Sequence, residues 1–303
     1  MTANLTEKTK NILNNSKNKV IAVVGATASG KTAYAIELAK KINGEVVSAD
    51  SRLVYKGFNI GCAKPSIEEQ DGIKHHMMDI VEPEHNYSAG LYETDAKKCI
   101  YDILKRGKVP IITGGTGLYF RVLLENYALP KIEPDYGLRN ELGKLTPEEL
   151  HKKLSELDSE GALLIAPTDK KKLIRAIEIV KISGMPLGKA RGQKDAEFEV
   201  EWIGRNFPRA ELYDRINKRV DLMFENGIIE ETKELLQRHG KIPNIIYTIG
   251  YQEVTAFLDG ELSLEEAKEI LKQNTRRYAK RQLTWFRKNK DINWNCYSEI
   301  LKK

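Results

Sequence analysis

Residues 25–32, Gly-Ala-Thr-Ala-Ser-Gly-Lys-Thr, match the pattern GxxxxGK[ST], which binds phosphate groups through backbone amides. Glycines in such a loop let successive N–H groups point at one anion, and the helix that follows adds a favourable dipole. Lys31 is expected to reach the outer phosphate and the Thr32 hydroxyl to hold Mg²⁺. A glycine turn without a ligand is the alternative. The predicted phosphate-binding residues are Gly25, Ala26, Thr27, Ala28, Ser29, Gly30, Lys31 and Thr32.

The loop alone does not identify the phosphate compound, although a nucleoside triphosphate is the usual ligand. A P-loop ATPase usually also has an apolar strand that ends in an acid, whereas residues 109–113 (VPIIT) lead into Gly-Gly. Asp50 does end an apolar run, at 45–50, and we consider it a candidate general base. An aspartate that only caps the following turn is the alternative.

Four short apolar runs predict strands, at 19–25, 45–50, 109–113 and 198–204. A helical pattern at 31–41 follows the phosphate loop, and strands that alternate with helices are typical of an α/β protein with a parallel sheet. Ligands of such sheets bind beyond the carboxyl ends of the strands. We therefore expect the phosphate loop, Asp50 and Thr116 to meet at one edge of the sheet.

Residues 129–197 differ from the rest, with helical periodicity, many charges and little strand-like sequence. A helix that starts near Thr168 and Asp169 is predicted to stop at Gly184, with Pro186 just beyond. The expected organisation is an α/β core interrupted by a helical insertion domain. Its parts are a loose polar arm at 1–19, the core at 20–128 and 198–303, and the insertion at 129–197.

The composition excludes several classes of protein. At 41% hydrophobic and 30% charged residues, a chain of 303 residues can form a sizeable core and is not a disordered or fibrous protein. No window offers the roughly 20 unbroken apolar residues of a membrane span, and the start of the chain lacks the apolar stretch of a signal peptide, so we expect a cytoplasmic protein. Cys62, Cys99 and Cys296 lie too far apart to indicate a disulfide framework or a zinc cluster.

Residues 271–290 contain eight Lys or Arg residues and no acid, which exceeds the net charge of +6 for the whole chain. Tyr278, Trp285 and Phe286 are interleaved with these charges. This combination favours a polyanion-binding surface over the alternative, a solvated helix face.

Six blocks of sequence, in this order, closely resemble the tRNA dimethylallyltransferases, also called tRNA isopentenyltransferases: GATASGKT, DSRLVYKGFNIGCAKP, HHMMDI, GGTGLYF, TIGYQE and TRRYAKRQLTWFR. The blocks extend from residue 25 to residue 287, and together they are highly specific. Ala26 and Cys62 depart from the proline and threonine that are common in the family. The eukaryotic zinc finger is absent, so the resemblance is to the bacterial type. It implies a P-loop NTPase-like core with a helical insertion.

The resemblance also implies a reaction, the transfer of a dimethylallyl group from dimethylallyl diphosphate to N6 of adenosine 37 in tRNA. It assigns the role of base to Asp50, and to Thr116 the orientation of the reacting amine or of a phosphate oxygen. Arg219, and after it Arg215, are expected at the diphosphate. Without the resemblance, Thr116 could equally be a helix N-cap and the arginines partners in surface ion pairs. The family suggests a monomer. We expect no membrane partner.

Two basic regions, near residues 171–175 and 280–287, are expected to contact tRNA. The residues predicted to bind tRNA are Asp50, Ser51, Arg52, Leu53, Arg139, Lys171, Lys172, Arg175, Gly250, Tyr251, Gln252, Lys280, Arg281, Gln282, Trp285 and Arg287. The target adenine is normally stacked and must be flipped out to reach a buried site. His75 and His76 are interpreted as structural, because adjacent strand residues point to opposite faces and no third metal ligand has a suitable spacing.

Two other functions fit parts of the sequence. A P-loop small-molecule kinase would use Asp50 to activate a hydroxyl, but it gives the basic segment no role. A non-catalytic RNA-binding protein would keep the loop as a vestige. The intact set of Lys31, Thr32, Asp50 and Thr116 argues against that second alternative.

Overall fold

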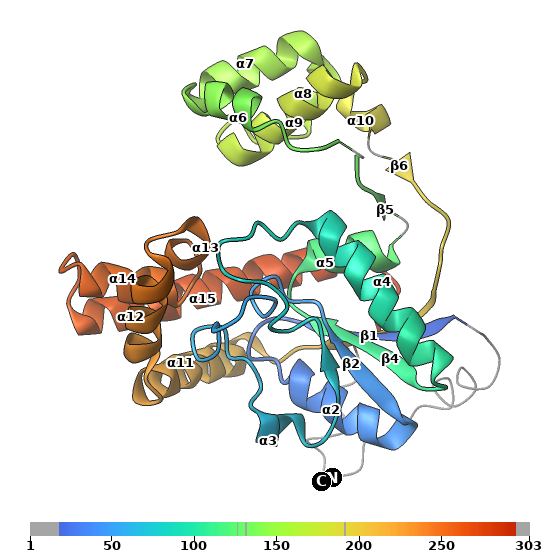
Figure 1. The fold of residues 1–303 in the computed structure, drawn as a ribbon, viewed down its shortest axis with the longest axis vertical. Coiled ribbons are helices and arrows are strands. Elements are labelled where there is room, and N and C mark those ends of the chain that lie inside the picture. Colours follow the sequence, from blue (N-terminus) through green and yellow to red (C-terminus); the bar gives the residue numbers. More distant parts are fainter. Residues whose placement is uncertain (1–17, 126, 131, 191, 295–303) are drawn as a thin grey trace. The chain divides into compact units, whose positions relative to one another are not determined.

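The computed structural model describes residues 18–125, 127–130, 132–190 and 192–294 (Figure 1). The chain divides into two compact units. One contains residues 1–124 and 197–303, and the other contains residues 125–196. The second unit is therefore an insertion in the chain of the first. The predicted arm at 1–19 falls almost entirely outside the described residues.

A five-stranded parallel sheet forms the centre of the first unit, with the strand order β3-β2-β4-β1-β7. The strands are β1 (Lys19–Gly25), β2 (Gly44–Ser48), β3 (His75–His76), β4 (Val109–Gly114) and β7 (Glu199–Arg205). Every residue of β1 and β2 is buried, as expected for parallel strands that are covered on both faces. The predicted α/β class with a parallel sheet is confirmed, although the two-residue strand β3 was not predicted.

Helices cover both faces of this sheet. The helices of the first unit are α2 (Lys31–Ile42), α3 (Ile67–Gln70), α4 (Ala89–Lys105), α5 (Gly117–Leu124), α11 (Arg209–Glu225), α12 (Ile228–His239), α13 (Pro243–Ile246), α14 (Tyr251–Leu258) and α15 (Leu264–Phe286). Buried side chains of α2 pack against Val46 and Ile111 on one face. On the other face Trp202 contacts Phe120 of α5, which packs edge-on against Phe286 of α15.

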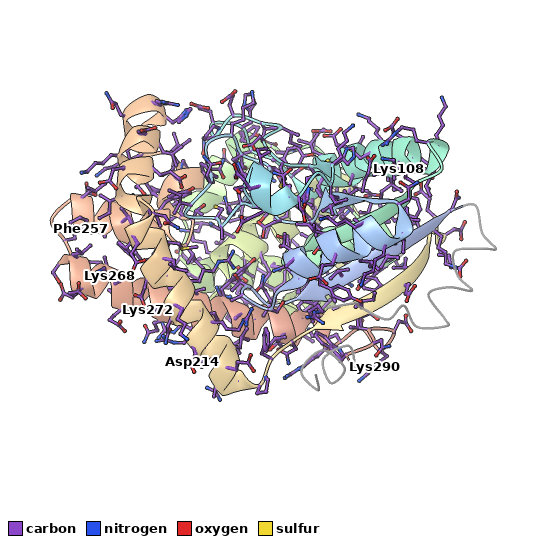
Figure 2. The ribbon with its side chains drawn as sticks, turned by 90° about the horizontal axis from the view of Figure 1, so that it is seen from below. Lys108, Asp214, Phe257, Lys268, Lys272 and Lys290 are labelled. Atoms are coloured by element: carbon purple, nitrogen blue, oxygen red, sulfur yellow. The ribbon has the colours of Figure 1, made fainter. Side chains whose placement is uncertain are left out.

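Polar contacts hold α15, the helix with the basic segment, to α11. Lys272, labelled in Figure 2, forms an ion pair with Asp221 of α11 at 2.9 Å. One turn further along α15, Arg276 donates a hydrogen bond to Asn217 at 2.6 Å. Part of the positive charge of the basic segment is therefore used to fix the helix in place.

The second unit contains β5 (Tyr127–Ala128), α6 (Tyr136–Gly143), α7 (Pro147–Leu157), α8 (Ser159–Leu163), α9 (Lys170–Ser183), α10 (Leu187–Ala190) and β6 (Gly192–Gln193). Leu150 of α7 and Leu173 of α9 are fully buried in its core. As predicted, α9 begins after Asp169, whose carboxylate caps it, and ends at Gly184, with φ 65°. After α5 ends at Leu124, Tyr127 belongs to β5, which pairs with β6.

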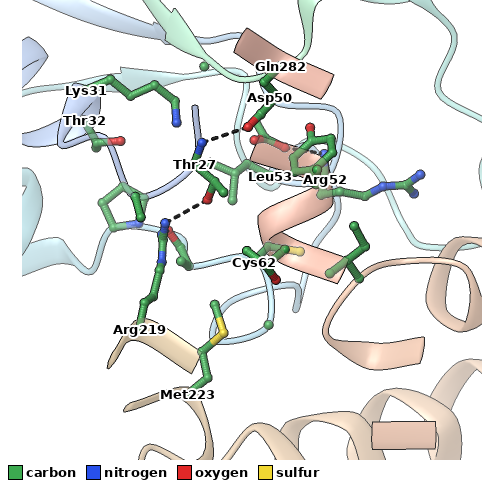
Figure 3. Close-up of a pocket in the computed structure, with 18 of the residues that line it drawn as sticks. Thr27, Lys31, Thr32, Asp50, Arg52, Leu53, Cys62, Arg219, Met223 and Gln282 are labelled. Atoms are coloured by element: carbon green, nitrogen blue, oxygen red, sulfur yellow. Dashed lines mark hydrogen bonds between the residues drawn. The ribbon is translucent and has the colours of Figure 1, made fainter. Parts of the chain in front are cut away.

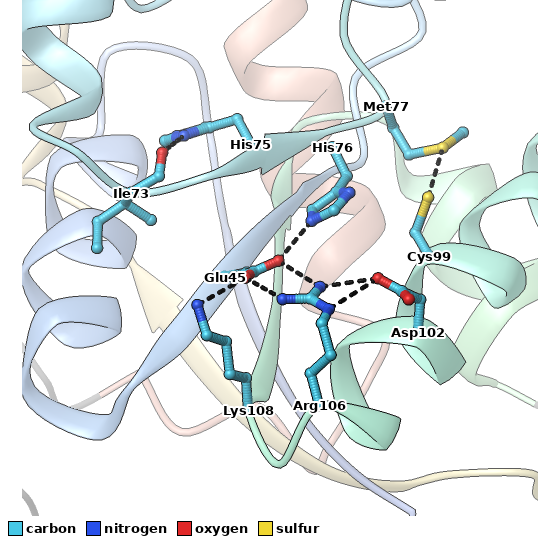
Figure 4. A network of polar contacts seen from close by, with 9 residues as sticks. All are labelled: Glu45, Ile73, His75, His76, Met77, Cys99, Asp102, Arg106 and Lys108. Atoms are coloured by element: carbon cyan, nitrogen blue, oxygen red, sulfur yellow. Dashed lines mark hydrogen bonds and ion pairs between the residues drawn. The ribbon is translucent and has the colours of Figure 1, made fainter.

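A buried carboxylate joins the amino end of β2 to its neighbours (Figure 4). Glu45 is 2% exposed and accepts hydrogen bonds from His76 at 2.7 Å, from Lys108 at 2.8 Å and from Arg106 at 2.7 Å. Arg106, followed by Lys108 and His76, holds the pKa of Glu45 well below its usual range, against the opposing effect of burial. His76 is therefore a structural residue, as predicted from the sequence.

Within the described ranges, the structure shows neither a helix long and apolar enough to span a membrane nor a group of three or more His, Cys, Asp or Glu side chains placed to hold a metal ion. Cys62 and Cys99 are free thiols, and Cys296 lies outside the described residues.

Replacing Glu45 by glutamine leaves three basic side chains facing an uncharged amide. We expect the free energy of unfolding at pH 7, measured by urea denaturation, to fall by about 3 kcal/mol. Glu234→Gln is the control, because this exposed side chain forms a surface ion pair with Arg238 at 3.6 Å, and its effect should stay below about 0.5 kcal/mol.

The same variant tests the pH dependence. Since the pKa of Glu45 is lowered in the folded state, its stabilising contribution is present above the ordinary value of 4.5 and is lost as the pH falls below it. The wild type should therefore lose more stability than Glu45→Gln between about pH 5 and about pH 3. An equal loss in both proteins would contradict the role assigned to the network.

Candidate active site

The phosphate loop connects β1 to α2, as the sequence predicts. Gly25 ends β1 at a point where a Cβ atom would lie 2.2 Å from the carbonyl oxygen of Arg205, so only glycine fits. Gly30 stands before α2 with φ 73°, a left-handed conformation that glycine adopts without strain. The loop therefore packs tightly on β7 and leads into a helix N-terminus, where backbone amides and the helix dipole favour an anion.

A cavity of about 690 Å³ lies beside the loop (Figure 3). The phosphate loop, the segment after β2 and side chains from α11 and α15 form its walls. The lining residues include Thr27, Lys31, Thr32, Asp50, Ser51, Arg52, Leu53, Arg215, Arg219, Tyr278, Arg281 and Gln282. Residues that the sequence separately suggests for phosphate and for tRNA thus line one cavity.

Two half-buried basic side chains, Lys31 and Arg219, face this cavity. Lys31 Nζ donates to the carbonyl oxygen of Ala26 at 3.3 Å, and Arg219 Nη1 donates to the Thr27 hydroxyl at 3.1 Å. Burial lowers the pKa of both side chains. For Lys31 the pKa falls to about 8, with the charge of Arg219 as the second cause and Asp50 acting in the opposite direction. The charge of Arg219 thus disfavours the protonated form of Lys31. An anion bound between the two cations would offset this repulsion.

Arg215 lies one turn before Arg219 on α11, and its Nε donates to the carbonyl oxygen of Ala28 at 3.1 Å. Its guanidinium lies over the ring of Phe207, 4.1 Å from the ring centre. Both arginines that were predicted at the diphosphate therefore contact the phosphate loop, Arg219 at Thr27 and Arg215 at Ala28.

Asp50 and Thr116 follow neighbouring strands, and both contact the same short segment. Asp50 Oδ1 accepts from the Arg52 amide at 2.9 Å, so the carboxylate caps a turn while it lines the cavity. Thr116 Oγ1 accepts from the Ser51 amide at 3.0 Å and donates to the Ser51 hydroxyl at 3.3 Å. The Thr116 hydroxyl thus fixes Ser51 beside Asp50.

Gln282, which the resemblance places at the tRNA, is only 4% exposed and lies between two loops of the site. Its Oε1 accepts from the Thr27 amide at 2.8 Å, and its Nε2 donates to the carbonyl oxygen of Gly115 at 3.0 Å. Tyr278, one turn earlier on α15, hydrogen-bonds with Gln282 and with Thr116. The amide of Gln282 therefore joins the phosphate loop to the segment before Thr116, a role with no local signal in the sequence.

The close approach of α15 explains two glycines of the GGTG run. A Cβ atom at Gly115 would lie 2.0 Å from Gln282 Nε2, and one at Gly117 would lie 2.2 Å from Trp285 Cδ1. Trp285 remains 36% exposed although its indole packs against Gly117. Larger residues at either glycine would move α15 away from the phosphate loop.

The other predicted tRNA contacts of the first unit differ in exposure. Those at the surface are Gln252, Lys280, Arg281 and Arg287. Tyr251 is fully buried, and its hydroxyl donates to Glu231 at 2.8 Å. A Cβ atom at Gly250 would lie 3.0 Å from the carbonyl oxygen of Gly61. In this structure Gly250 and the side chain of Tyr251 therefore support the core and present no surface to RNA.

In the second unit a buried acid holds two of the predicted arginines. Glu178 is fully buried, accepts from Arg139 Nε at 2.8 Å and forms an ion pair with Arg175. Lys171 and Lys172, on the first turn of α9, are exposed. The two lysines thus lie at the surface, whereas the two arginines are paired with a buried acid.

A phosphate-loop motif on a parallel sheet, facing a cavity lined by basic side chains and a carboxylate, is typical of P-loop α/β proteins. The family model described as IPP transferase matches residues 53–289. The chain belongs to this family.

Two relatives of the same name align with nearly the whole length of this chain. It is 43% identical to the tRNA dimethylallyltransferase of Thermomicrobium roseum over 286 residues, which are 92% of this chain and 87% of that protein. The enzyme of the same name from Pelotomaculum thermopropionicum is also 43% identical, over 92% of this chain and 91% of its own length. The resemblance stated from the sequence is thereby confirmed.

Solved structures show the same likeness. The full-length tRNA isopentenylpyrophosphate transferase of Bacillus halodurans is 42% identical, with a TM-score of 0.70 over 91% of this chain and 89% of that one. A eukaryotic dimethylallyltransferase acting on tRNA is 30% identical, with a TM-score of 0.77 over 89% of this chain and 70% of that one. The predicted P-loop core is therefore shared with structures of this family.

The lowered pKa of Lys31 predicts that anion binding takes up protons. A bound diphosphate would favour the charged ammonium and raise this pKa from about 8, so Lys31 itself should take up about half a proton at pH 8 and almost none at pH 6.5, in addition to any exchange by the diphosphate. Affinity should accordingly fall as the pH rises above 8. Calorimetry of inorganic diphosphate in buffers with different ionisation enthalpies measures the uptake. In Lys31→Met this component should disappear, and equal uptake by both proteins would show that another group titrates.

Proposed function

We propose that this chain transfers a dimethylallyl group from dimethylallyl diphosphate to N6 of adenosine 37 in tRNAs, giving N6-(dimethylallyl)adenosine and diphosphate. The observation that carries the proposal is the meeting of the phosphate loop, Arg219 and Asp50 in one cavity. Membership of the IPP transferase family supports it, and relatives carry the name tRNA dimethylallyltransferase.

The diphosphate is the leaving group in this reaction. As the bond between C1 of the allyl group and the bridging oxygen breaks, negative charge grows on the diphosphate. Lys31, Arg219 and the loop amides stabilise that charge from fixed positions, and Arg215 adds a second guanidinium. Such preorganised electrostatic stabilisation is usually the largest single contribution to catalysis.

The nucleophile is the exocyclic amine of adenine, whose lone pair is delocalised into the ring. A bond forms between N6 and C1, and Asp50 accepts the proton that N6 loses. The Arg52 amide holds one oxygen of Asp50, and Thr116 fixes the neighbouring Ser51. A positioned base of this kind contributes about 10²- to 10⁴-fold in rate.

Mg²⁺ fits the residues at the start of α2. The Thr32 hydroxyl lines the cavity, and Mg²⁺ usually keeps several waters while it binds one or two protein oxygens and substrate phosphates. Thr32 and the diphosphate oxygens would hold the ion in this site. When bound, it neutralises charge on the leaving group.

The RNA approaches from the side of α15 in this proposal. Lys280, Arg281 and Arg287 are exposed on the helix whose Tyr278 and Gln282 reach the cavity. Adenosine 37 must leave its stack to enter the cavity, where Ser51 and Leu53 also lie. We further propose that the enzyme acts as a monomer, as the family resemblance suggests, and in the cytoplasm.

Incubation of the protein with radiolabelled dimethylallyl diphosphate, Mg²⁺ and unmodified tRNA, without ATP, tests the function. Label should enter the RNA and should be recovered as N6-(dimethylallyl)adenosine after digestion. A P-loop kinase would instead need ATP and transfer its γ-phosphate. A non-catalytic RNA-binding protein would retain the tRNA without incorporating label, and either of these results would refute the proposal.

The role of Asp50 is tested with Asp50→Asn, which keeps an oxygen for the Arg52 amide and removes the base. Turnover should fall about 10²- to 10⁴-fold while tRNA affinity stays within about twofold. Asp214→Asn is the control, because Asp214 is exposed on α11, and it should retain wild-type turnover. Unchanged turnover in Asp50→Asn would exclude Asp50 as the base.

The bridge formed by Gln282 is tested with Gln282→Leu, which removes its hydrogen bonds to Thr27 and Gly115 at similar side-chain volume. Misplacement of the loop should lower turnover about 10- to 100-fold. Gln273→Leu changes an exposed glutamine of the same helix and should have little effect. Comparable turnover in both variants would show that the bridge does not position the site.

A further inference from the structure

The cavity has a second polar region, for which the proposed reaction gives no role. Side chains on three neighbouring strands form it, namely His75 of β3, Ser48 of β2 and Thr113 of β4. In the parallel register Ser48 is paired with Thr113, and His75 with Val46. Paired residues share a face, and Val46 belongs to the face that α2 covers. All three polar side chains therefore lie on the sheet face covered by α2, the helix that contains Thr32.

Two buried polar atoms of this region, His75 Nε2 and Thr113 Oγ1, have no hydrogen-bond partner within the described part of the chain. Thr113 is only 6% exposed, and Ser48 is 3% exposed. A buried polar group without a partner costs about 1–3 kcal/mol. These atoms are therefore the ones that a polar ligand in the cavity would satisfy.

The hydrogen bond of His75 to the backbone fixes its tautomer. Nδ1 lies 2.8 Å from the carbonyl oxygen of Ile73, which can only accept, so Nδ1 carries the proton. Burial lowers the pKa of His75, which keeps the ring neutral. Nε2 then has a lone pair and no hydrogen, and it acts only as an acceptor.

An acceptor-only atom limits the chemistry of its neighbour. A bare phosphate oxygen does not fit next to Nε2, because both are acceptors. A water molecule on a divalent metal does fit, since Mg²⁺ keeps several waters when it binds phosphates, and the metal makes these waters strong donors. The Lys31 ammonium, which also lines the cavity, donates to the carbonyl oxygen of Ala26.

We propose that His75 Nε2 and the Thr113 hydroxyl, on the two strands that flank β2, accept hydrogen bonds from water bound to the divalent metal at the phosphate loop. His75 and Thr113 thereby supply the outer contacts that an acid at the end of a core strand supplies in P-loop ATPases. The proposal rests on the proposed function, because it requires a metal–diphosphate complex in this cavity. His75 is a positioning residue in this role, since it acts on the metal through water.

Three variants of the full chain separate this role from a structural one. His75→Asn retains an amide N–H for the carbonyl oxygen of Ile73 but has no atom at the place of Nε2. His75→Gln places an amide oxygen near that position. His76→Asn is the matched control, because the neighbouring histidine lies on the same strand and its partner is Glu45, in the network described above.

The readout is calorimetric binding of inorganic diphosphate at increasing Mg²⁺ concentrations. In His75→Asn the Mg²⁺ concentration for half-maximal binding should rise about 10- to 100-fold, the usual effect of losing an outer partner of a metal site. His75→Gln should recover a large part of this loss, and His76→Asn should stay within about twofold of the wild type. Diphosphate binding without Mg²⁺ should be the same in His75→Asn and in the wild type.

Either of two results on the variants, or a third on the wild type, would overturn the proposal. One is an equal Mg²⁺ requirement in His75→Asn and His76→Asn. The other is an equal weakening of diphosphate binding in His75→Asn with and without Mg²⁺, because that indicates a distorted phosphate site. If Mg²⁺ has no effect on binding by the wild type, the metal assignment at Thr32 fails and the role of His75 fails with it. The prenyl-transfer assay distinguishes that result from failure of the whole proposed function.

Discussion

The two half-buried positive charges beside the phosphate loop are the constraint on which the rest of the site depends. Lys31 and Arg219 line one cavity, and the charge of Arg219 makes it harder to keep Lys31 protonated. Asp50 opposes this effect only in part, because it acts in the other direction as the smallest of the three causes. An anion with several charged oxygens provides the balance that one carboxylate cannot. The cavity is therefore better matched to a diphosphate than to a neutral substrate.

Helix α15 holds the parts of this cavity in register. Gln282 uses both ends of its amide, one on Thr27 of the phosphate loop and one on Gly115. The glycines of the GGTG run allow this approach, since a Cβ atom at Gly115 or Gly117 would collide with the helix. The same helix carries the exposed basic residues, so a macromolecule bound along α15 contacts an element that directly touches the phosphate site. The basic segment is thus both a surface and a wall of the cavity.

The sequence predicted the features that depend on neighbouring residues, and it missed those that depend on distant ones. The phosphate loop between β1 and α2 and the limits of α9 at Asp169 and Gly184 were predictable, because glycines, caps and apolar spacing act within a few residues. The bridge by Gln282 was not, because Thr27 lies 255 positions away along the chain. Strand β3 has only two residues and is tied to Glu45, so it leaves no periodic pattern.

The carboxyl end of β4 shows why this P-loop protein has no acid in the usual place. In an ATPase an acid there serves a reaction at phosphorus, whereas in the proposed transfer the carbon next to the diphosphate is attacked and the phosphorus atoms do not react. The base is then needed beside the organic nucleophile, and Asp50 at the end of β2 meets that need. At the end of β4, Gly114 packs closely on the segment after β2, because a Cβ atom there would lie 2.2 Å from the carbonyl oxygen of Ala49. This close packing of the two strand ends brings Thr116 to Ser51, next to Asp50. A glycine at the end of β4, where an ATPase has its acid, therefore also helps to position the proposed base.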